Sequence, residues 1–325
     1  MKQMKFLSFP ILMTAMLSIF FVGCDDDDMM DDVNPPVSKS IVDIALETPE
    51  LSILVEALQA ADLVDVLDDL SSTYTVLAPT DDAFADLLTD LGLTKEELLA
   101  LPNLGDILLF HVIDGDVRST DLATGYVKTL NATGPGGTSP DLRVVVDGSV
   151  TFNGSSVVSA ADVVADNGVV HIINKVMLAP TIVDLALSND AFTSLVAALT
   201  AADNTIDFVG LLSGDGPFTV FAPTNDAFQA LLDSDPTWNV LTDIPLAVRE
   251  TVLTYHVTDA GNVESGTLTN GQLIPTLEGS NLEVDLSTGA QLITGSGQTV
   301  NIIVTDVQGT NGIVHVVEAV LIPVL

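Results

Sequence analysis

Four segments of the chain occur twice, in the same order and at almost the same separation. The second copy of each lies 141 to 145 residues after the first, so only small insertions separate the two halves. A period of roughly 145 residues is too long for one solenoid unit and close to the commonest size of a whole domain. The repeat therefore predicts two tandem copies of one domain, residues 37–180 and 181–325, joined near Pro180 with almost no linker. The paired segments are SIVDIAL (40–46) with TIVDLAL (181–187), TVLAPTDDAF (75–84) with TVFAPTNDAF (219–228), LLFHV (108–112) with LTYHV (253–257), and NGVVHIINKVMLAP (167–180) with NGIVHVVEAVLIP (311–323).

The order of the periodic patterns within a copy indicates its fold class. Apolar residues fall at helical spacing between 41 and 58 and again between 84 and 88, and Thr94 with Glu97 forms a capping box for a further helix. A short apolar strand is expected at 75–78. Residues around Asp147-Gly148 then predict a hairpin over 142–154, and a closing strand is expected over 169–178. Helices first and mostly strands later predict an α+β domain.

The decapeptide at 75–84 ends in acidic residues, which raises the question of an active site. Pro79 fixes its own φ and ends the strand, and Thr80 or Asp81 can cap the helix that follows. Asp82 then lies in the first helical turn, where the helix dipole favours negative charge, and Phe84 is expected in the core. A metal site would repeat its ligands, but Asn replaces Asp81 in the second copy, which favours a structural role. The equivalent residues there are Pro223, Thr224, Asn225, Asp226 and Phe228.

The four histidines of the chain occupy two equivalent positions in each copy. One interpretation is a paired metal or acid–base site. The other is a ring whose two nitrogens satisfy buried backbone groups. The rings sit inside apolar runs, with no cysteine nearby and no repeated Asp/Glu–His spacing, which favours the structural interpretation. The residues are His111, His171, His256 and His315.

An Asn-Gly pair precedes the closing strand of both copies, at Asn167-Gly168 and Asn311-Gly312. We expect a turn with positive φ there, a conformation that glycine adopts without steric cost. The pair is therefore predicted to be structural.

The decapeptides, the aromatic–histidine pairs and the Asn-Gly-x-x-His endings resemble the fasciclin domain family, and the resemblance covers about Val37 to the C-terminus. It implies two tandem fasciclin-like domains, each a β-sheet wedge with packed α-helices. It also implies cell adhesion and contact with the extracellular matrix through proteins or glycans. The Tyr-His element is linked to adhesion in the family, so Tyr255 and His256 form the candidate adhesion element. Phe110 and His111 replace it in the first copy, without the phenol.

The N-terminus predicts export. Lys2 and Lys5 precede an apolar run that ends at Gly23, a pattern typical of a signal peptide over 1–23, with an uncleaved membrane anchor as the alternative. The single cysteine, Cys24, follows at once, and this resembles a bacterial lipoprotein signal whose cysteine is lipidated. The acidic segment 24–36 is typical of an extended tether, with a metal-binding cluster as the alternative, and resembles the surface-export signals of Bacteroidetes-type lipoproteins. We expect a lipid-anchored protein on the outer membrane, facing outward.

The net charge and the absence of common catalytic motifs disfavour several classes of function. A formal net charge of −36 disfavours nucleic acid and direct adsorption to anionic lipid. The sequence has no G-x-S-x-G elbow, no phosphate loop ending in Gly-Lys-Ser/Thr and no H-E-x-x-H. No motif specifies an oligomeric state. We therefore expect no cofactor, no metal and no catalysis, but a cell-surface adhesion protein that binds a surface or matrix protein or a glycan. The alternative is a polysaccharide-processing enzyme or ligand-capture protein that uses the repeated histidines.

The lipidation hypothesis predicts the behaviour of one substitution. Cells grown with a fatty-acid probe should label the native protein, and Cys24→Ala should remove the label because the acyl acceptor is gone. Protein levels on an immunoblot provide the control for expression. Undiminished labelling of Cys24→Ala would contradict the hypothesis.

Overall fold

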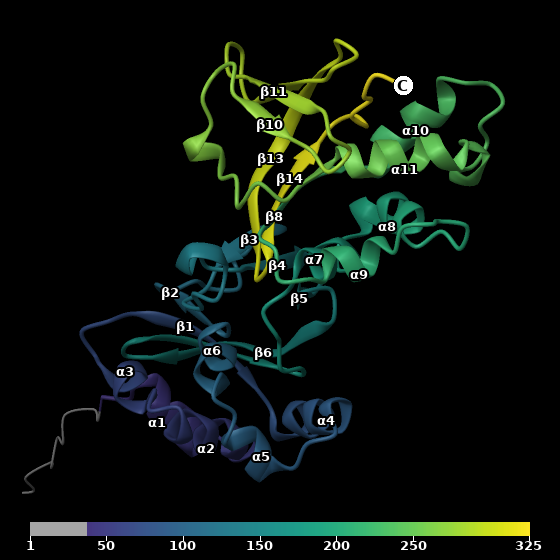
Figure 1. Cartoon of the computed structure of the whole chain (residues 1–325). Helices are drawn as coiled ribbons and strands as arrows, with labels where there is room; N and C mark the ends of the chain where they lie inside the picture. Colours follow the sequence, from purple (N-terminus) through teal and green to yellow (C-terminus); the bar gives the residue numbers. More distant parts are fainter. Residues whose placement is uncertain (1–37) are drawn as a thin grey trace, which may run out of the picture. The chain divides into compact units, whose positions relative to one another are not determined.

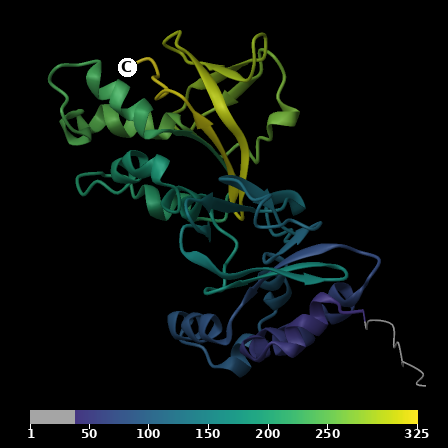
Figure 2. The same ribbon diagram turned by 180° about the vertical axis from the view of Figure 1, so that it is seen from behind.

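The computed structural model describes residues 38–325, so the predicted signal peptide, Cys24 and the acidic tether lie outside the described residues. Each copy of the repeat contains short helices and one seven-stranded sheet (Figure 1). Seen from both sides, the helices of a copy gather on one side of its strands (Figure 2). This confirms the α+β class and the tandem arrangement expected from the repeat.

Within the described residues each copy has seven strands, and the first copy has six α-helices where the second has five. In the first copy the helices are α1 (Ile41–Glu47), α2 (Ser52–Ala60), α3 (Val64–Asp68), α4 (Asp81–Leu91), α5 (Lys95–Leu99) and α6 (Leu104–Leu109), and the strands are β1 (Tyr74–Pro79), β2 (Val112–Asp114), β3 (Gly125–Lys128), β4 (Asp141–Val146), β5 (Val150–Phe152), β6 (Ser156–Ala165) and β7 (Gly168–Ile173). In the second copy the helices are α7 (Ile182–Leu187), α8 (Thr193–Leu199), α9 (Phe208–Leu212), α10 (Asn225–Asp233) and α11 (Leu246–Tyr255), and the strands are β8 (Phe218–Pro223), β9 (Val257–Thr258), β10 (Leu273–Pro275), β11 (Asn281–Asp285), β12 (Gln291–Ile293), β13 (Thr299–Gly309) and β14 (Gly312–Val317).

Each sheet is built around one parallel pair of strands. The strand order is β2-β1-β7-β6-β5-β4-β3 in the first copy, and the second copy repeats it as β9-β8-β14-β13-β12-β11-β10. The first strand of a copy therefore pairs in parallel with the last, Tyr74 opposite Gly168 and Phe218 opposite Gly312, while the other pairings are antiparallel. Every residue of β7 and β14 is buried. Strands covered on both faces read as continuous apolar runs, which is how these segments look in the sequence.

The parallel pair lies between two hydrophobic cores. Val76 and Ala78 of β1 pack with the helices, whereas Leu77 between them packs with Phe110, Leu142 and Phe152 on the other face of the sheet. The second copy repeats this division with Val220 and Ala222 on the helix side and Phe221 on the other. Since side chains alternate between the two faces of a strand, a strand that contributes side chains to both cores must be apolar at every position.

The predicted hairpin and capping box are present. Strands β4 and β5 pair antiparallel around Gly148, whose φ is 68°, and the Thr94 and Glu97 side chains cap each other's backbone amides at the start of α5. The closing strand is shorter than the predicted 169–178, because β7 ends at Ile173. Its partner β1 ends at Pro79, and Thr80 already begins the turn into α4, so no backbone remains for later residues to pair with.

Asn167 and Asn311 connect the two ends of each domain. The Oδ1 atom of Asn167 accepts from the backbone N of Ile41 at 2.8 Å, and its Nδ2 donates to the carbonyl of Leu67 at 2.7 Å. Next to it, Asp166 N donates to the Lys39 carbonyl at 2.7 Å. In the second copy Asn311 accepts from Ile182 N at 3.0 Å and donates to the Leu212 carbonyl at 2.8 Å, while Thr310 N donates to the Pro180 carbonyl at 2.8 Å. We call these contacts the entry clamp of each domain.

Gly168 follows Asn167 because the parallel strands approach closely there. Its φ is 142°, and a Cβ atom added to it would lie 1.8 Å from the carbonyl oxygen of Tyr74. The sequence predicts positive φ at this position, but the stronger constraint is contact with the neighbouring backbone, which only glycine permits.

The predicted joint near Pro180 falls between β7 and α7. Contacts cross from one copy to the other: Arg143 Nη1 donates to the Ser188 carbonyl at 2.7 Å, and Gln308 N donates to Oδ2 of Asp141 at 2.7 Å. The domain boundaries themselves stay predictions. In the part of the chain from Ser38 onward, no helix is long and apolar enough to span a membrane.

The entry clamp predicts a large stability loss for Asn167→Ala. The substitution leaves the buried amide of Ile41 and the buried carbonyl of Leu67 without their partner, which should lower the free energy of unfolding by about 3 kcal/mol. Asn103→Ala is the matched control, because Asn103 is exposed and its side chain caps nothing, so its effect should stay within about 0.5 kcal/mol. Denaturant unfolding measures both, and similar small losses would show that the clamp contributes little.

Candidate functional site

The decapeptide at 75–84 contains the end of a strand, the cap of a helix and a contact in the core. Pro79 is the buried last residue of β1, and Oγ1 of Thr80 accepts from the backbone N of Ala83 at 3.2 Å. Phe84 is buried in the helix-side core, and Asp82 lies exposed in the first turn of α4. Each polar or apolar group thus has a position that the strand-to-helix turn explains. Pro223, Thr224, Asp226 and Phe228 occupy the same places in the second copy.

Asp81 holds the start of another helix. Its carboxylate accepts from Ile53 N at 2.8 Å and from Ser52 Oγ at 2.6 Å, at the beginning of α2. Asn225 accepts from Ser194 N at 2.9 Å at the equivalent start of α8. The position needs only an oxygen acceptor, which explains why Asp and Asn both serve.

His111 and His256 connect the end of a helix to the segment after the last strand. Nδ1 of His111 bonds the carbonyl of Ile107 at 2.8 Å, and its Nε2 accepts from Met177 N at 2.9 Å. His256 repeats this with Val252 at 2.7 Å and Leu321 at 2.9 Å. A ring nitrogen that faces a carbonyl must carry the proton, so both rings are neutral with the proton on Nδ1.

His171 and His315 use the opposite tautomer. Nε2 of His171 bonds the carbonyl of Val117 at 2.9 Å, and its Nδ1 accepts from Asp162 N at 3.2 Å. His315 makes the same contacts with Val263 and Asp306, at 2.8 and 3.3 Å. Asp162 and Asp306 have φ of 58° and 61° at irregular positions in β6 and β13, so these rings hold a strand bulge against a loop.

Burial favours the neutral form of three imidazoles, those of His111, His256 and His315. Burial lowers the pKa of His111 and of His256 to about 4, with the bond to the carbonyl of Ile107 or Val252 opposing it. Burial likewise lowers the pKa of His315. A neutral ring with both nitrogens bonded to the backbone has no free lone pair for a metal ion or for a substrate proton.

The candidate adhesion element lies in the interior. Tyr255 is 0% exposed, and its hydroxyl donates to the Asn281 carbonyl at 2.9 Å and accepts from Gly295 N at 3.0 Å. Phe110 is also 0% exposed, and it packs in the core on the far side of the first sheet. The element stays a prediction, but its buried side chains offer no surface for direct contact with a partner. An effect of this element on adhesion would therefore be indirect, through the conformation of the domain.

The predicted residues do not converge on one site. The two histidines of a copy bond different segments, and the Asn-Gly pairs lie at the entry clamps. Within residues 38–325, no three His, Cys, Asp or Glu side chains are placed to hold a metal ion together. The residues that sequence reasoning missed are the acceptors Asp81 and Asn225 and the bulge residues Asp162 and Asp306. Asp81 and Asn225 bond residues 28 and 31 positions earlier, and the carboxylates of Asp162 and Asp306 accept from the amides of Ser119 and Ser265, 43 and 41 positions earlier, so no local pattern could have revealed them.

A hollow of about 630 Å³ lies around the joint between the copies. Arg143, Asn153 and Ser155 contribute polar groups to its lining. Leu178 and Leu187 also line it, and both are exposed, at 45% and 62%. Exposed apolar side chains beside polar groups are typical of surfaces that bind other molecules.

Comparison with known proteins gives a consistent result. The model of the Fasciclin domain family matches residues 49–179 and 190–323. The chain is 31% identical over 256 residues to the transforming growth factor-beta-induced protein ig-h3 of Sus scrofa, which covers 77% of this chain and 35% of that protein. It is 37% identical over 145 residues to protein sll1483 of Synechocystis sp., which covers 45% of this chain and 74% of that one.

Human periostin is 28% identical over 77% of this chain, and the match spans 28% of periostin. The chain therefore spans about a third of the length of ig-h3 and of periostin. Among solved structures, a FAS1 domain pair from the insect cell adhesion molecule Fasciclin I has a TM-score of 0.47 and 21% identity, over 83% of this chain and 97% of that one.

The buried histidines predict an acid-sensitive fold. Each folded-state pKa of about 4 lies below the ordinary value of 6.5, so the unfolded chain binds more protons between these values. Stability is therefore fully present above pH 6.5 and falls as the pH drops towards 4. From pH 7.5 to 5 the loss should be about 2 kcal/mol for each of the two histidines.

Denaturant unfolding at the two pH values measures this loss. His256→Phe should be less stable at pH 7.5, since Leu321 N loses its acceptor, yet its stability should depend less on pH. Nitrogen-15 NMR of the rings provides the independent check: His111 and His256 should carry the proton on Nδ1 and stay neutral until about pH 4. Titration of either ring near 6.5 would contradict the assignment.

Proposed function

Because the chain belongs to the fasciclin domain family, we propose that it is a non-catalytic cell-surface adhesion protein that binds a surface or matrix protein or a glycan. The observation that carries the proposal is that the polar residues shared by the two copies form hydrogen bonds with the backbone of their own domain. Both nitrogens of all four histidines bond backbone groups, and the side chains of Asn167 and Asn311 do the same. What the two copies share therefore builds the domain, and binding is left to their outer surfaces.

The alternative, an enzyme that uses the histidines, gains no support from their positions. General acid–base catalysis needs a ring nitrogen that reaches the substrate and a pKa near the working pH. His111 and His256 are buried, and their pKa of about 4 is too low for that task at neutral pH.

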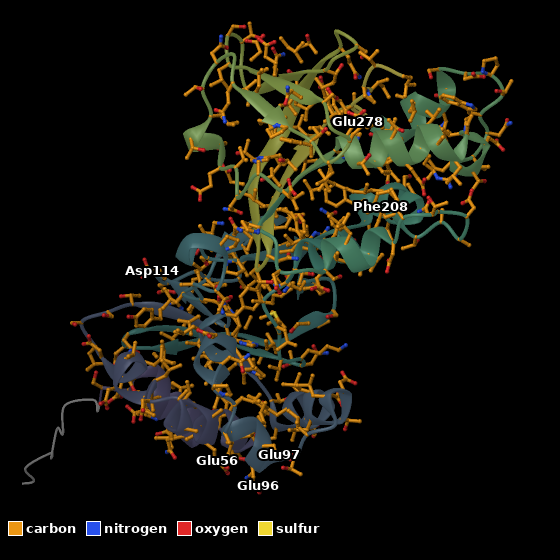
Figure 3. All side chains as sticks on the ribbon, viewed as in Figure 1. Glu56, Glu96, Glu97, Asp114, Phe208 and Glu278 are labelled. Atoms are coloured by element: carbon orange, nitrogen blue, oxygen red, sulfur yellow. The ribbon has the colours of Figure 1, made fainter. Side chains whose placement is uncertain are left out.

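The proposed location is the outer membrane, with Cys24 lipidated and the domains facing outward. The support is the sequence of the N-terminal segment and the strong excess of acidic residues, 45 against 9 basic. Acidic side chains such as Glu96 and Glu97 lie at the outer edge of the first copy (Figure 3). Like charges on the protein and on an anionic lipid surface repel, which favours domains that stand away from the bilayer.

The proposed contact surface is the hollow at the joint. It combines exposed Leu178 and Leu187 with the polar groups of Arg143 and Asn153, and both copies contribute to it. Apolar side chains with polar neighbours are the composition in which a few residues supply most of the binding energy of an interface.

Adhesion of whole cells tests the function and the surface separately. Cells that display the protein should bind matrix-coated or cell-coated surfaces better than cells that lack it. Leu187→Lys should reduce this binding about tenfold, because it places a charge among the exposed apolar side chains of the hollow. Leu46→Lys is the matched control, since Leu46 is the equivalent residue of the first copy, 59% exposed, and does not line the hollow.

Equal binding with and without the protein, across protein and glycan coatings, would contradict the adhesion proposal. Equal loss in Leu187→Lys and Leu46→Lys would instead contradict only the choice of surface.

A further inference from the structure

An arginine is buried in the second domain where the first domain has a leucine. Arg249 lies on α11 and is 3% exposed. The matching bonds of His111 to Ile107 and of His256 to Val252 align the two helices, and this alignment places Arg249 opposite Leu104, which is also 3% exposed. A charge thus replaces an apolar side chain at an interior position, and burial of a charge is costly unless its hydrogen bonds are made.

The hydrogen bonds of this guanidinium are incomplete. Nη2 donates to Oδ1 of Asp203 at 2.6 Å and to Oδ1 of Asn204 at 3.1 Å, and Nε reaches the same Asn204 oxygen at 3.4 Å. Nη1 is buried and has no hydrogen-bond partner anywhere in the described chain. Two N–H donors therefore remain unused in the interior, where an unmet donor loses its bonds to water without gaining others.

The same side chain lines a cavity of about 190 Å³. The rest of the lining is almost entirely apolar and comes from α8, α10, α11, the loop between α10 and α11, and the C-terminal segment. Helices α10 and α11 and the C-terminal segment lie together in Figure 1. A water molecule needs two to four polar partners to be stable in a cavity, and this lining supplies few. Among the apolar residues are Phe228, Leu231, Trp238, Ile244, Val248 and Ile322.

We propose that this cavity binds a small apolar molecule that carries one carboxylate group, with the carboxylate accepting from the guanidinium of Arg249. A carboxylate has only acceptor oxygens, and its hydrogen bonds to guanidinium are stronger than those of a neutral acceptor. The apolar body follows from the lining. The size of the ligand follows from the volume of the cavity, which equals the space of about six waters. Pockets for drug-sized ligands are larger, with volumes of about 300 Å³ or more.

The site belongs to the second domain alone, because Leu104 takes the place of the arginine in the first. It is also separate from the hollow at the joint, since the two share no lining residue. The inference therefore does not depend on the adhesion proposal.

The single tryptophan of the chain reports on this cavity. Trp238 is the only tryptophan and lines the cavity, so its fluorescence should change when the cavity fills. We expect octanoate to change the emission of the full-length protein in a saturable way and to raise the midpoint of thermal unfolding. Octanol, of similar shape without the charge, should bind at least tenfold more weakly, and octylamine should not bind.

Arg249→Leu tests the role of the guanidinium. The variant should fold, because leucine fills the equivalent position in the first domain and Asp203, half exposed, remains solvated. It should bind octanoate at least tenfold more weakly, with no such loss for octanol. Arg118→Leu is the matched control, since Arg118 lies in the first domain and pairs with Asp116 on the surface, and it should bind octanoate like the native protein.

Three results would overturn the proposal: equal octanoate affinity in native protein and Arg249→Leu, equal affinity of the native protein for octanol and octanoate, or no saturable change in either fluorescence or thermal midpoint with octanoate. Circular dichroism of each variant shows that a loss of binding is not a loss of fold.

Discussion

Buried hydrogen bonds between side chains and backbone connect the helical half of each domain to its strands. Asn167 reaches back 126 residues to the amide of Ile41, and His111 reaches forward 66 residues to the amide of Met177. Contacts between such distant segments require the chain to close long loops first, and they stabilise the domain only once it is nearly folded. The parallel pairing of β1 with β7 has the same long range. The first and last segments of a domain must therefore meet before either core is complete.

The features predicted from the sequence are those with local causes. The helix starts, the capping box of Thr94 and Glu97, and the hairpin at Gly148 each follow from residues a few positions apart. The repeat predicted two tandem domains, and the Fasciclin domain model matches a segment of each copy. The roles of Asn167, Asp81 and Asp162 could not be predicted in detail, because their side chains bond residues far away in the sequence, Leu67, Ile53 and Ser119. The histidines are intermediate: the apolar runs around them predicted burial, but the opposite tautomers depend on which loops surround each ring.

Residues that the two copies share build the fold of each domain, whereas residues that differ make one domain unlike the other. The shared polar groups are engaged with backbone, so differences between copies are where separate roles can arise. Tyr255 replaces Phe110 and pins the carbonyl of Asn281, whereas Arg249 replaces Leu104 and leaves two donors without partners. The first exchange adds a hydroxyl whose hydrogen bonds are made within the domain. The exchange of Leu104 for Arg249 lowers stability, because it buries donors that no group of the domain satisfies. This cost is the reason that Arg249 supports a ligand site.

The entry clamps also determine how a domain would carry mechanical tension. Lys39 and Ile41, where the chain enters the first domain, bond Asp166 and Asn167, directly before β7. Pro180 and Ile182 make the equivalent bonds to Thr310 and Asn311 before β14. Tension applied at the entry and exit of a domain would pass through these few bonds into its last strand and bypass the rest of the sheet. Stretching would thus load the clamps in shear, and their rupture would set the force at which each domain begins to extend.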